Sequence, residues 1–462
     1  MNVLCFMMNY WKTAKFFLFL PPLGMALVTP SVLFPFIVGK YVWFRGSVSF
    51  ALIAFSLGML FQDQNGEMLK RLKDFFRRPL VIAVSAFAFF FALASLFAFD
   101  PAIAFWSNFE RGEGGLQILN LFVYFSLLLV LFRDAKDWRR LFVCAIIGGI
   151  LSIFYGLLAG MGSDGFIGPL FSESGFRFQA SIGNPAYVAI YAIFLSFFAL
   201  YLFVSSRFSI RSLRRVLLAF LIVAFILMFY FAATRGAFVG LIGMFLAFLG
   251  YVMLSRKALR KWFLVAASIV IFLVFLGVQF HNTEFVRSLP GSRILDLSFT
   301  ARTFEDRTIM WNIAWEGFKA RPLLGWGPEN YIQVFDRHFD IRYFRSSQNF
   351  GAWFDRAHSI YFDYLVEIGI LGLLSFLSIF AVFYFEFFRA TRTRNRETKD
   401  KQETGSVSVS RRDLIVRGLL FSLPFAYLIQ GLVLFDVFTI YLNVFIFLSF
   451  SSYLFYFAKQ SL

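Results

Sequence analysis

Long apolar runs separated by short polar stretches recur along the whole chain. Two of them, Leu217 to Ala233 and Trp262 to Phe280, approach the length of about 20 residues that a helix needs to cross a bilayer. The pattern predicts twelve membrane helices near residues 16–39, 45–62, 79–98, 115–132, 141–160, 185–204, 216–233, 236–254, 262–280, 359–388, 413–434 and 437–457. We therefore expect an all-α, polytopic membrane protein.

The basic residues alternate with these predicted helices. Clusters of Lys and Arg follow the second, fourth, sixth and eighth helices, and residues 389–412 after the tenth form the most basic segment. The loops after odd-numbered helices carry far fewer basic residues, apart from one long loop. Because cytoplasmic loops are enriched in Lys and Arg, the pattern predicts that both termini are cytoplasmic and that 389–412 is a cytoplasmic loop.

Composition supports a membrane protein and narrows its partners. Of the 462 residues, 59% are hydrophobic and 15% are charged. In soluble domains, about half of the residues are hydrophobic and about a quarter are charged. A net charge of +17 in a soluble protein would suggest nucleic acid. Here the basic residues lie between apolar segments, so no nucleic acid partner is expected.

Cysteines and the N-terminus add little further chemistry. Cys5 and Cys144 have no Cys or His nearby at metal-ligand spacing. The sequence also has no Asp-x-Asp in a predicted external loop and no Gly-rich phosphate loop, so neither a metal nor another cofactor is expected. Lys12 and Lys15 precede the first apolar run without a convincing cleavage site. We expect a first membrane helix there, not a removed signal peptide.

The long polar segment 281–358 lies outside the membrane by parity. Within it, Asp306–Lys319 predicts an amphipathic helix that ends before Pro322, and a second helix is expected from Glu329 after a Gly-Pro turn. Its aromatic residues suit membrane anchoring or stacking on sugar rings. The expected organisation is a transmembrane bundle (1–280), an external loop (281–358) and three closing helices (359–462).

Arginines are few on the predicted external face, and their positions suggest a phosphate site. Arg235 lies in a turn between two apolar helices, where a charge is costly unless it faces a partner or a cavity. The alternative is a side chain that snorkels to the lipid headgroups. A guanidinium matches phosphate oxygens in pairs, so an external cavity lined by Arg177, Arg235 and Arg307 would suit a diphosphate.

His358 lies where the long loop returns to the membrane, at the start of the tenth predicted helix. A histidine there can act as a base near pH 7, or can simply form hydrogen bonds at a helix start. The sequence leaves these two roles open.

Together, these segments resemble the O-antigen ligase and polymerase superfamily of bacterial membrane glycosyltransferases. The likeness rests on His358 with Glu367–Gly372 beyond it, Arg307–Trp311, Pro322–Asn330, Thr234–Ala237, Gly183–Pro185 and Phe34–Lys40. It covers essentially the whole chain, and the order of the motifs around one external loop is its most specific part. Val239 stands where the family often has Leu, which we interpret as a packing change.

The resemblance implies a GT-C-like helical bundle with the loop folded over an external cavity. It implies catalytic roles for His358, Arg235 and Arg307, although Arg293, Arg302 and Arg321 lie close to the last of these. It further suggests substrate contacts for Arg177, Asn184, Arg111, Trp326 and Asn330. The implied reaction is a metal-independent, inverting transfer from an undecaprenyl-diphosphate-linked glycan to an acceptor hydroxyl at the outer face of the bacterial cytoplasmic membrane.

Several functions share this chemistry. A ligase acts on lipid A-core or another lipid, a polymerase extends a lipid-linked glycan with repeat units, and a protein O-oligosaccharyltransferase modifies protein. A flippase or transporter for lipid-linked sugars is a different class, and it predicts internal repeats and polar residues at mid-membrane depth. The sequence shows neither feature. A purely structural scaffold leaves Arg235 and His358 on one face without a reason.

Overall fold

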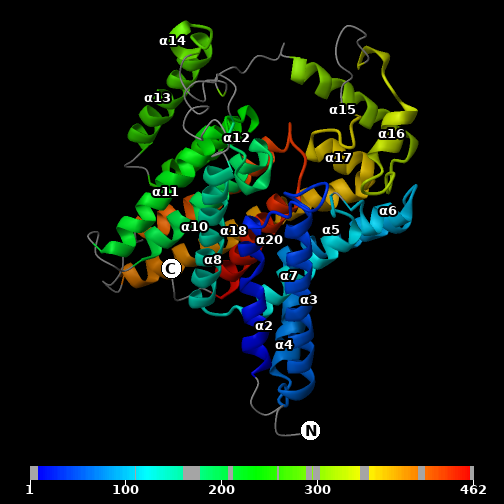
Figure 1. Ribbon diagram of the computed structural model, residues 1–462. Helices are drawn as coiled ribbons and strands as arrows, with labels where there is room; N and C mark the ends of the chain where they lie inside the picture. Colours follow the sequence, from blue (N-terminus) through cyan, green and yellow to red (C-terminus); the bar gives the residue numbers. More distant parts are fainter. Residues whose placement is uncertain are drawn as a thin grey trace. The chain divides into compact units, whose positions relative to one another are not determined.

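The chain is all helical over the residues that the structure, a computed structural model, describes (Figure 1). These are residues 9–109, 111–159, 177–206, 212–256, 260–287, 294, 302–343, 353–403 and 411–457. Ten of the described helices are long and apolar enough to cross a membrane, and Gly115–Leu131 is a shorter apolar helix. The predicted polytopic membrane fold is confirmed.

The chain divides into two compact units, which we describe separately. The first consists of Met1–Cys144, Phe299–Glu386 and Gly431–Phe457, and the second of Ala145–Ser298, Phe387–Gln430 and Ala458–Leu462. The predicted division at residues 281 and 359 follows the membrane topology instead, and it stays a prediction.

The first unit is built around α7 (Gly115–Leu131). This helix packs against α3 (Val38–Phe61), α5 (Pro79–Leu96) and α20 (Phe438–Tyr456). The apolar runs of the sequence form these helices, and α20 is buried along almost its full length. Large apolar side chains on the outer faces of α3 and α5 are exposed, as a lipid-facing surface allows: Phe50, Ile53, Ile82 and Phe89.

The first predicted helix, 16–39, is wrong as a continuous span. The structure has α2 (Tyr10–Phe19), then the 3₁₀ helix η1 (Pro21–Ala26), and the next helix begins at Val38, before the predicted start at residue 45. Pro21 and Pro22 end α2 because proline lacks the N–H of a helical hydrogen bond and its ring clashes with the preceding turn.

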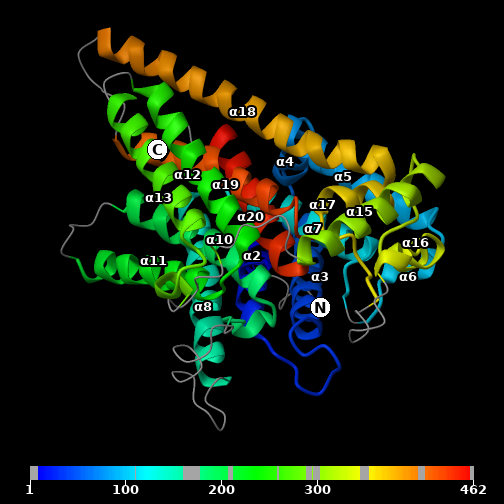
Figure 2. The ribbon, with the colours of Figure 1, turned by 90° about the horizontal axis from the view of Figure 1, so that it is seen from above.

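The predicted helix 359–388 is two helices, α17 (Ile360–Glu367) and α18 (Gly369–Glu403). Gly369 has φ +67, and a Cβ there would lie 2.3 Å from the carbonyl oxygen of Leu323. Only glycine meets both conditions without strain, so the chain changes direction here. Part of the predicted loop 389–412 is also helical, because α18 runs on to Glu403 as one long helix (Figure 2).

The long loop folds as a small subdomain with its own core. Both predicted helices are present, as α15 (Arg302–Ala320) and α16 (Tyr331–Arg337), and they pack against α17. The Tyr331 hydroxyl donates a hydrogen bond to the Met310 carbonyl at 2.9 Å. The buried core of this subdomain contains Ile309, Met310, Ile313, Ala314, Trp326, Tyr331, Val334, Phe335, Ala357 and Val366.

The second unit contains the remaining membrane helices. They are α10 (Pro185–Ser205), α11 (Leu213–Phe231), α12 (Arg235–Ser255), α13 (Arg260–Gln279) and α19 (Arg411–Gln430), with the short α14 (Glu284–Arg287). One further span, α8 (Ala135–Ala159), begins in the first unit and continues in the second. α10 packs along α11, and α12 along α19. The α12–α19 approach is close, since a Cβ on Gly240 would lie 2.7 Å from the Ala426 carbonyl oxygen.

Basic residues gather at one end of the first unit. The guanidinium of Arg78 lies 4.3 Å from the centre of the Phe457 ring, and that of Arg133 lies 4.0 Å from the same ring. Arg78 and Arg133 come from two of the basic clusters that the sequence places on one side of the membrane. The start of α5 and the end of α7 therefore lie at the same end of this unit, whereas the cytoplasmic location of that end stays a prediction.

Candidate functional site

His358 lies at the junction between the loop subdomain and the membrane helices. It has φ +60, a left-handed conformation that is uncommon for a residue other than glycine. The next residue, Ser359, is the N-cap of α17. The N–H of Ile360 donates to the carbonyl oxygens of Gly431 (2.9 Å) and Leu434 (3.0 Å) and so ties the start of α17 to the segment before α20.

The ring of His358 is held with one nitrogen available. Its Nδ1 lies 3.1 Å from the Arg356 carbonyl oxygen. Because a carbonyl can only accept, Nδ1 carries the hydrogen and Nε2 keeps its lone pair. The rings of Phe354 and Phe435 pack edge-on against the imidazole, with centres 5.0 and 5.1 Å away.

The surroundings of His358 favour the neutral imidazole. Burial lowers its pKa below 6.5, the hydrogen bond to Arg356 opposes the shift, and the positive charges of Arg307 and Arg111 add to it. His358 is therefore a neutral hydrogen-bond acceptor at pH 7, which is the form that a general base requires.

The peptide group between Arg356 and Ala357, whose carbonyl orients His358, is fixed by contacts of both residues. Arg356 Nη1 donates to Glu367 at 2.5 Å, and Nη2 forms a short ion pair with Glu329 and a longer one, 3.4 Å, with Glu113. The N–H of Ala357 donates to Asp363 Oδ1 at 2.7 Å. All these side chains are buried. We call Arg356, Glu113, Glu329 and Glu367 the Arg356 cluster.

The Arg356 cluster joins distant parts of the chain. Glu113 precedes α7, Glu329 lies in the turn after α15, and Glu367 ends α17. The second oxygen of Glu113 accepts the N–H of Phe438 at 2.8 Å, at the start of α20. The N–H of Glu329, whose φ is +63, donates to Glu367 at 3.1 Å.

Three carboxylates share one buried cation, so the cluster is rich in acid groups. Burial raises the pKa of Glu113 to about 8, although the charge of Arg356 opposes the shift. Burial raises the pKa of Glu367 in the same way. Desolvation thus keeps carboxyl protons in the cluster at neutral pH.

Arg111, in the segment that precedes α7, is brought close to His358 within the first unit. Its Nε and Nη2 donate to Asp355 Oδ2 at 2.8 and 2.6 Å, and its guanidinium lies 5.1 Å from the Phe435 ring that also packs on His358. Burial opposes ionisation of Asp355, but the charges of Arg111 and Arg356 outweigh it and lower its pKa.

The other predicted residues of the loop have different surroundings. Arg307 is half-buried on α15, and its charge acts on His358. Trp326 is 2% exposed, and its indole N–H donates to the Gly317 carbonyl at 2.8 Å. Asn330 donates to the carbonyls of Asp100 (3.3 Å) and Pro328 (3.0 Å). These contacts give Trp326 and Asn330 a packing role, and their contact with substrate stays a prediction.

In the second unit, the structure brings Arg177 to the turn that holds Arg235. Arg177 Nη2 donates to Thr234 Oγ1 at 2.9 Å, and Nε donates to the Ala232 carbonyl at 3.3 Å. Arg235 is the first residue of α12. Asn184 caps α10, since its Oδ1 accepts the N–H of Ala186 at 2.9 Å.

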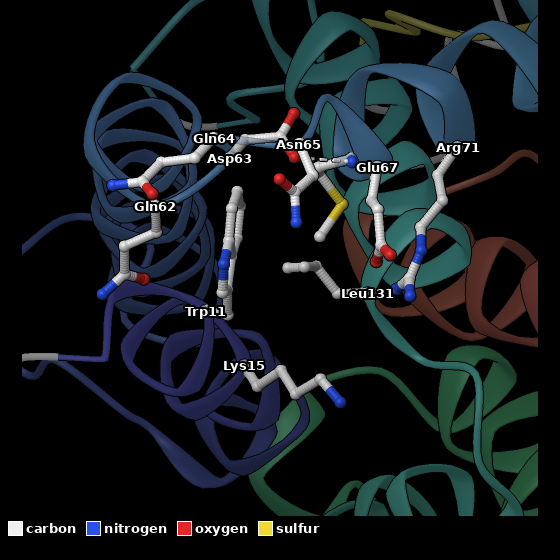
Figure 3. Close-up of a pocket in the computed structure, with 10 residues that line it drawn as sticks. Trp11, Lys15, Gln62, Asp63, Gln64, Asn65, Glu67, Arg71 and Leu131 are labelled. Atoms are coloured by element: carbon white, nitrogen blue, oxygen red, sulfur yellow. Dashed lines mark hydrogen bonds between the residues drawn. The ribbon is translucent and has the colours of Figure 1, made fainter.

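A cavity of about 370 Å³ lies at the other end of the first unit (Figure 3). It is lined by Trp11, Lys15, Gln62, Asp63, Gln64, Asn65, Glu67, Met68, Arg71 and Leu131. Leu131 ends α7, whereas Glu113 precedes it, and a helix of this length spans about 25 Å. The cavity is therefore separate from the surroundings of His358. Within the described ranges, no three His, Cys, Asp or Glu side chains are grouped to hold a metal ion.

The Arg356 cluster was missed by the sequence analysis. Its members are separated by up to 254 residues along the chain, from Glu113 to Glu367, so no local motif connects them. A weak signal exists: Glu113 lies two residues after Arg111, between two glycines, and Arg356 lies two residues before His358. Charges at the edges of apolar helices are costly unless they are paired.

Comparison with known families identifies one domain. Residues 220–377 match the model of a family described as O-antigen ligase. The matched segment contains Arg235, Arg307 and His358 together with the Arg356 cluster members Glu329, Arg356 and Glu367. No curated protein matches the chain.

Proposed function

We propose that this protein transfers an undecaprenyl-diphosphate-linked glycan to an acceptor hydroxyl at the outer face of the cytoplasmic membrane. It carries an O-antigen ligase domain over residues 220–377 and is thus an enzyme of the glycosyltransferase type. The observation that carries the proposal is the state of His358. Its Nδ1 is committed to the Arg356 carbonyl, and its burial keeps the imidazole neutral. A fixed, neutral imidazole with Nε2 available is suited to take a proton.

The proposed reaction is a single displacement. The acceptor oxygen forms a bond to the anomeric carbon as the bond from that carbon to the diphosphate oxygen breaks. The hydroxyl proton passes to His358 Nε2, and undecaprenyl diphosphate leaves with the bonding electron pair. One displacement inverts the anomeric centre. General base assistance of this kind typically contributes about 10²–10⁴-fold to the rate.

In this proposal, arginines bind the diphosphate and need no metal ion. Arg307 and Arg235, with Arg177 beside the turn of Arg235, donate to phosphate oxygens whose charge rises as the leaving group departs. Guanidinium–phosphate hydrogen bonds are charge-assisted and often bidentate, which suits a developing negative charge. Arg111 is already paired with Asp355, so we assign it to the support of His358 and Phe435.

The test is transfer from a defined undecaprenyl-diphosphate glycan by the full-length protein in reconstituted membranes, with EDTA present. His358→Ala should lower transfer by about 10²–10⁴-fold, and Arg235→Ala and Arg307→Ala should lower it as well. His338→Ala is the matched control, because His338 lies in the same loop, where it is the C-cap of α16. Full activity of a folded His358→Ala variant would remove the base assignment.

The size of the product separates the possible acceptors. A ligase attaches the glycan once to a lipid, a polymerase yields a ladder of repeat units, and a protein acceptor gives a glycosylated polypeptide. If the parent protein moves the lipid-linked glycan across the bilayer without transfer, the enzyme proposal is wrong.

A further inference from the structure

Two arginines of the loop subdomain lie over the same pair of aromatic rings. The guanidinium carbons of Arg321 and Arg337 are each 4.8 Å from the centre of the Trp326 ring. They are 5.8 and 5.0 Å from the Phe99 ring. The two guanidinium groups are therefore neighbours around one aromatic pair, and their carbons are at most 9.6 Å (twice 4.8 Å) apart.

Neither arginine is neutralised by a carboxylate among the residues that the structure describes. The acidic neighbour of Arg337 in sequence, Asp336, instead accepts the indole N–H of Trp353 at 2.6 Å. Stacking on aromatic faces uses the flat surface of a guanidinium and leaves its N–H edge available for an anion.

The arginine pair lies level with the ends of two candidate membrane spans. α5 ends at Leu96, three residues before Phe99. The carbonyl of Pro322, the residue after Arg321, accepts the N–H of Ile370 at 2.9 Å, at the start of the α18 span. The pair is therefore placed at the depth where lipid headgroup phosphates lie.

Apolar side chains next to these residues are open to the surroundings. Leu96 and Phe97 are each 64% exposed, and Leu323 is 63% exposed. Exposed apolar groups beside two cations form a boundary that matches a phospholipid, with acyl chains against the first and the phosphate against the second.

We propose that Arg321 and Arg337 bind the phosphate of an anionic membrane phospholipid whose acyl chains lie along Leu96, Phe97 and Leu323. The bound lipid anchors the turn after α15 at the membrane surface. That turn carries Glu329, which pairs with Arg356, whose carbonyl orients His358. The lipid therefore supports the geometry of the base without contacting it.

The test measures lipid binding directly, so it can be read even if the proposed glycan transfer fails. The full-length protein in detergent is titrated with phosphatidylglycerol, and bound lipid is counted by native mass spectrometry. Arg321→Gln/Arg337→Gln should weaken the tightest phosphatidylglycerol site roughly 30-fold, about 2 kcal/mol, because each basic residue at an anionic surface contributes about 1 kcal/mol. Phosphatidylcholine should bind the parent protein no better than it binds this variant.

Lys319→Gln/Arg342→Gln is the matched control. It removes the same charge from the same loop, but these residues are paired with Glu316 and Asp340. It should leave the tight site intact. A second variant, Arg321→Lys/Arg337→Lys, keeps the charge and loses the planar fork, so its affinity should fall between those of the parent and the Gln variant. This variant keeps the proposal testable if the Gln variant does not fold.

Three results would overturn the proposal. Equal losses in the Gln variant and its control would show a general effect of charge. Unchanged phosphatidylglycerol binding in both Arg variants would show that no lipid phosphate is held there. If the Arg variants still bind phosphatidylglycerol but no longer bind undecaprenyl diphosphate, the phosphate held by this pair belongs to the glycan donor.

Discussion

Replacing Arg356 by alanine removes the only cation within the Arg356 cluster. The Arg356 side chain is 7% exposed, and those of its three acidic partners are 2–3% exposed. In such surroundings, water cannot replace the lost partner. Leaving buried charge without its counter-ion typically destabilises a protein by about 3–5 kcal/mol.

The three carboxylates do not contribute equally to this cost. The raised pKa of Glu113 keeps its proton largely bound at neutral pH, and its oxygen is 3.4 Å from Arg356. Burial raises the pKa of Glu367 as well, so the shortest ion pair, that of Arg356 with Glu329, dominates the loss. We expect Arg356→Ala to lower the free energy of unfolding by about 3–5 kcal/mol at pH 7. The loss should shrink at acidic pH, because protonated carboxyl groups need no cation.

The assay is equilibrium unfolding of the purified protein in mixed micelles with a rising fraction of sodium dodecyl sulfate, followed by tryptophan fluorescence. The control is Arg342→Ala, which breaks an ion pair with Asp340 whose arginine side chain is 66% exposed. A surface pair of this kind contributes little to stability, because solvent screens the two charges. If Arg356→Ala costs no more than Arg342→Ala, the cluster does not stabilise the fold and our account of how His358 is positioned is wrong.

Three further predictions concern the pH profile and two local features. Because the pKa of His358 is lowered below 6.5 and the base must be neutral, the transfer rate should be level near pH 7 and fall only below pH 6.5; a decline that begins above pH 7 would contradict the burial of His358. Gly369→Ala should lower the thermal unfolding midpoint through a strain of about 1–3 kcal/mol or more, because its φ is +67 and the new Cβ meets the Leu323 carbonyl. Gly46→Ala in α3 is the control and should not lower the midpoint, since no atom lies within 4 Å of the new Cβ. Asn184→Ala should cost about 1 kcal/mol of stability through the lost cap of α10, and transfer per folded molecule should persist if capping is its whole role; a large loss of transfer without a loss of stability would indicate a substrate contact.

The sequence by itself indicated most of the apolar helices and the two helices of the long loop. Most apolar runs of membrane length became helices. The helix predicted over Asp306–Lys319, with its stop before Pro322, is present as α15. The sequence also placed His358 at the end of the loop. These features are local, because a helix needs only the residues within one turn of each other.

Local pattern failed where packing or backbone geometry decided the outcome. The apolar run 16–39 is interrupted by prolines, and the run 359–388 is broken at Gly369 because the Leu323 carbonyl approaches it. The basic segment after residue 388 was expected to be a loop, yet α18 continues through Glu403.

Only the tertiary structure showed what holds His358 in place. Glu113 and Arg356 are 243 residues apart, and nothing near either one in the sequence indicates that they meet. The stability of such a group depends on which side chains exclude water together, and that is a property of the folded chain. The sequence could therefore identify a candidate base, whereas the carbonyl that orients it, the buried ion pairs that fix the carbonyl, and the arginine pair at the membrane surface required the fold.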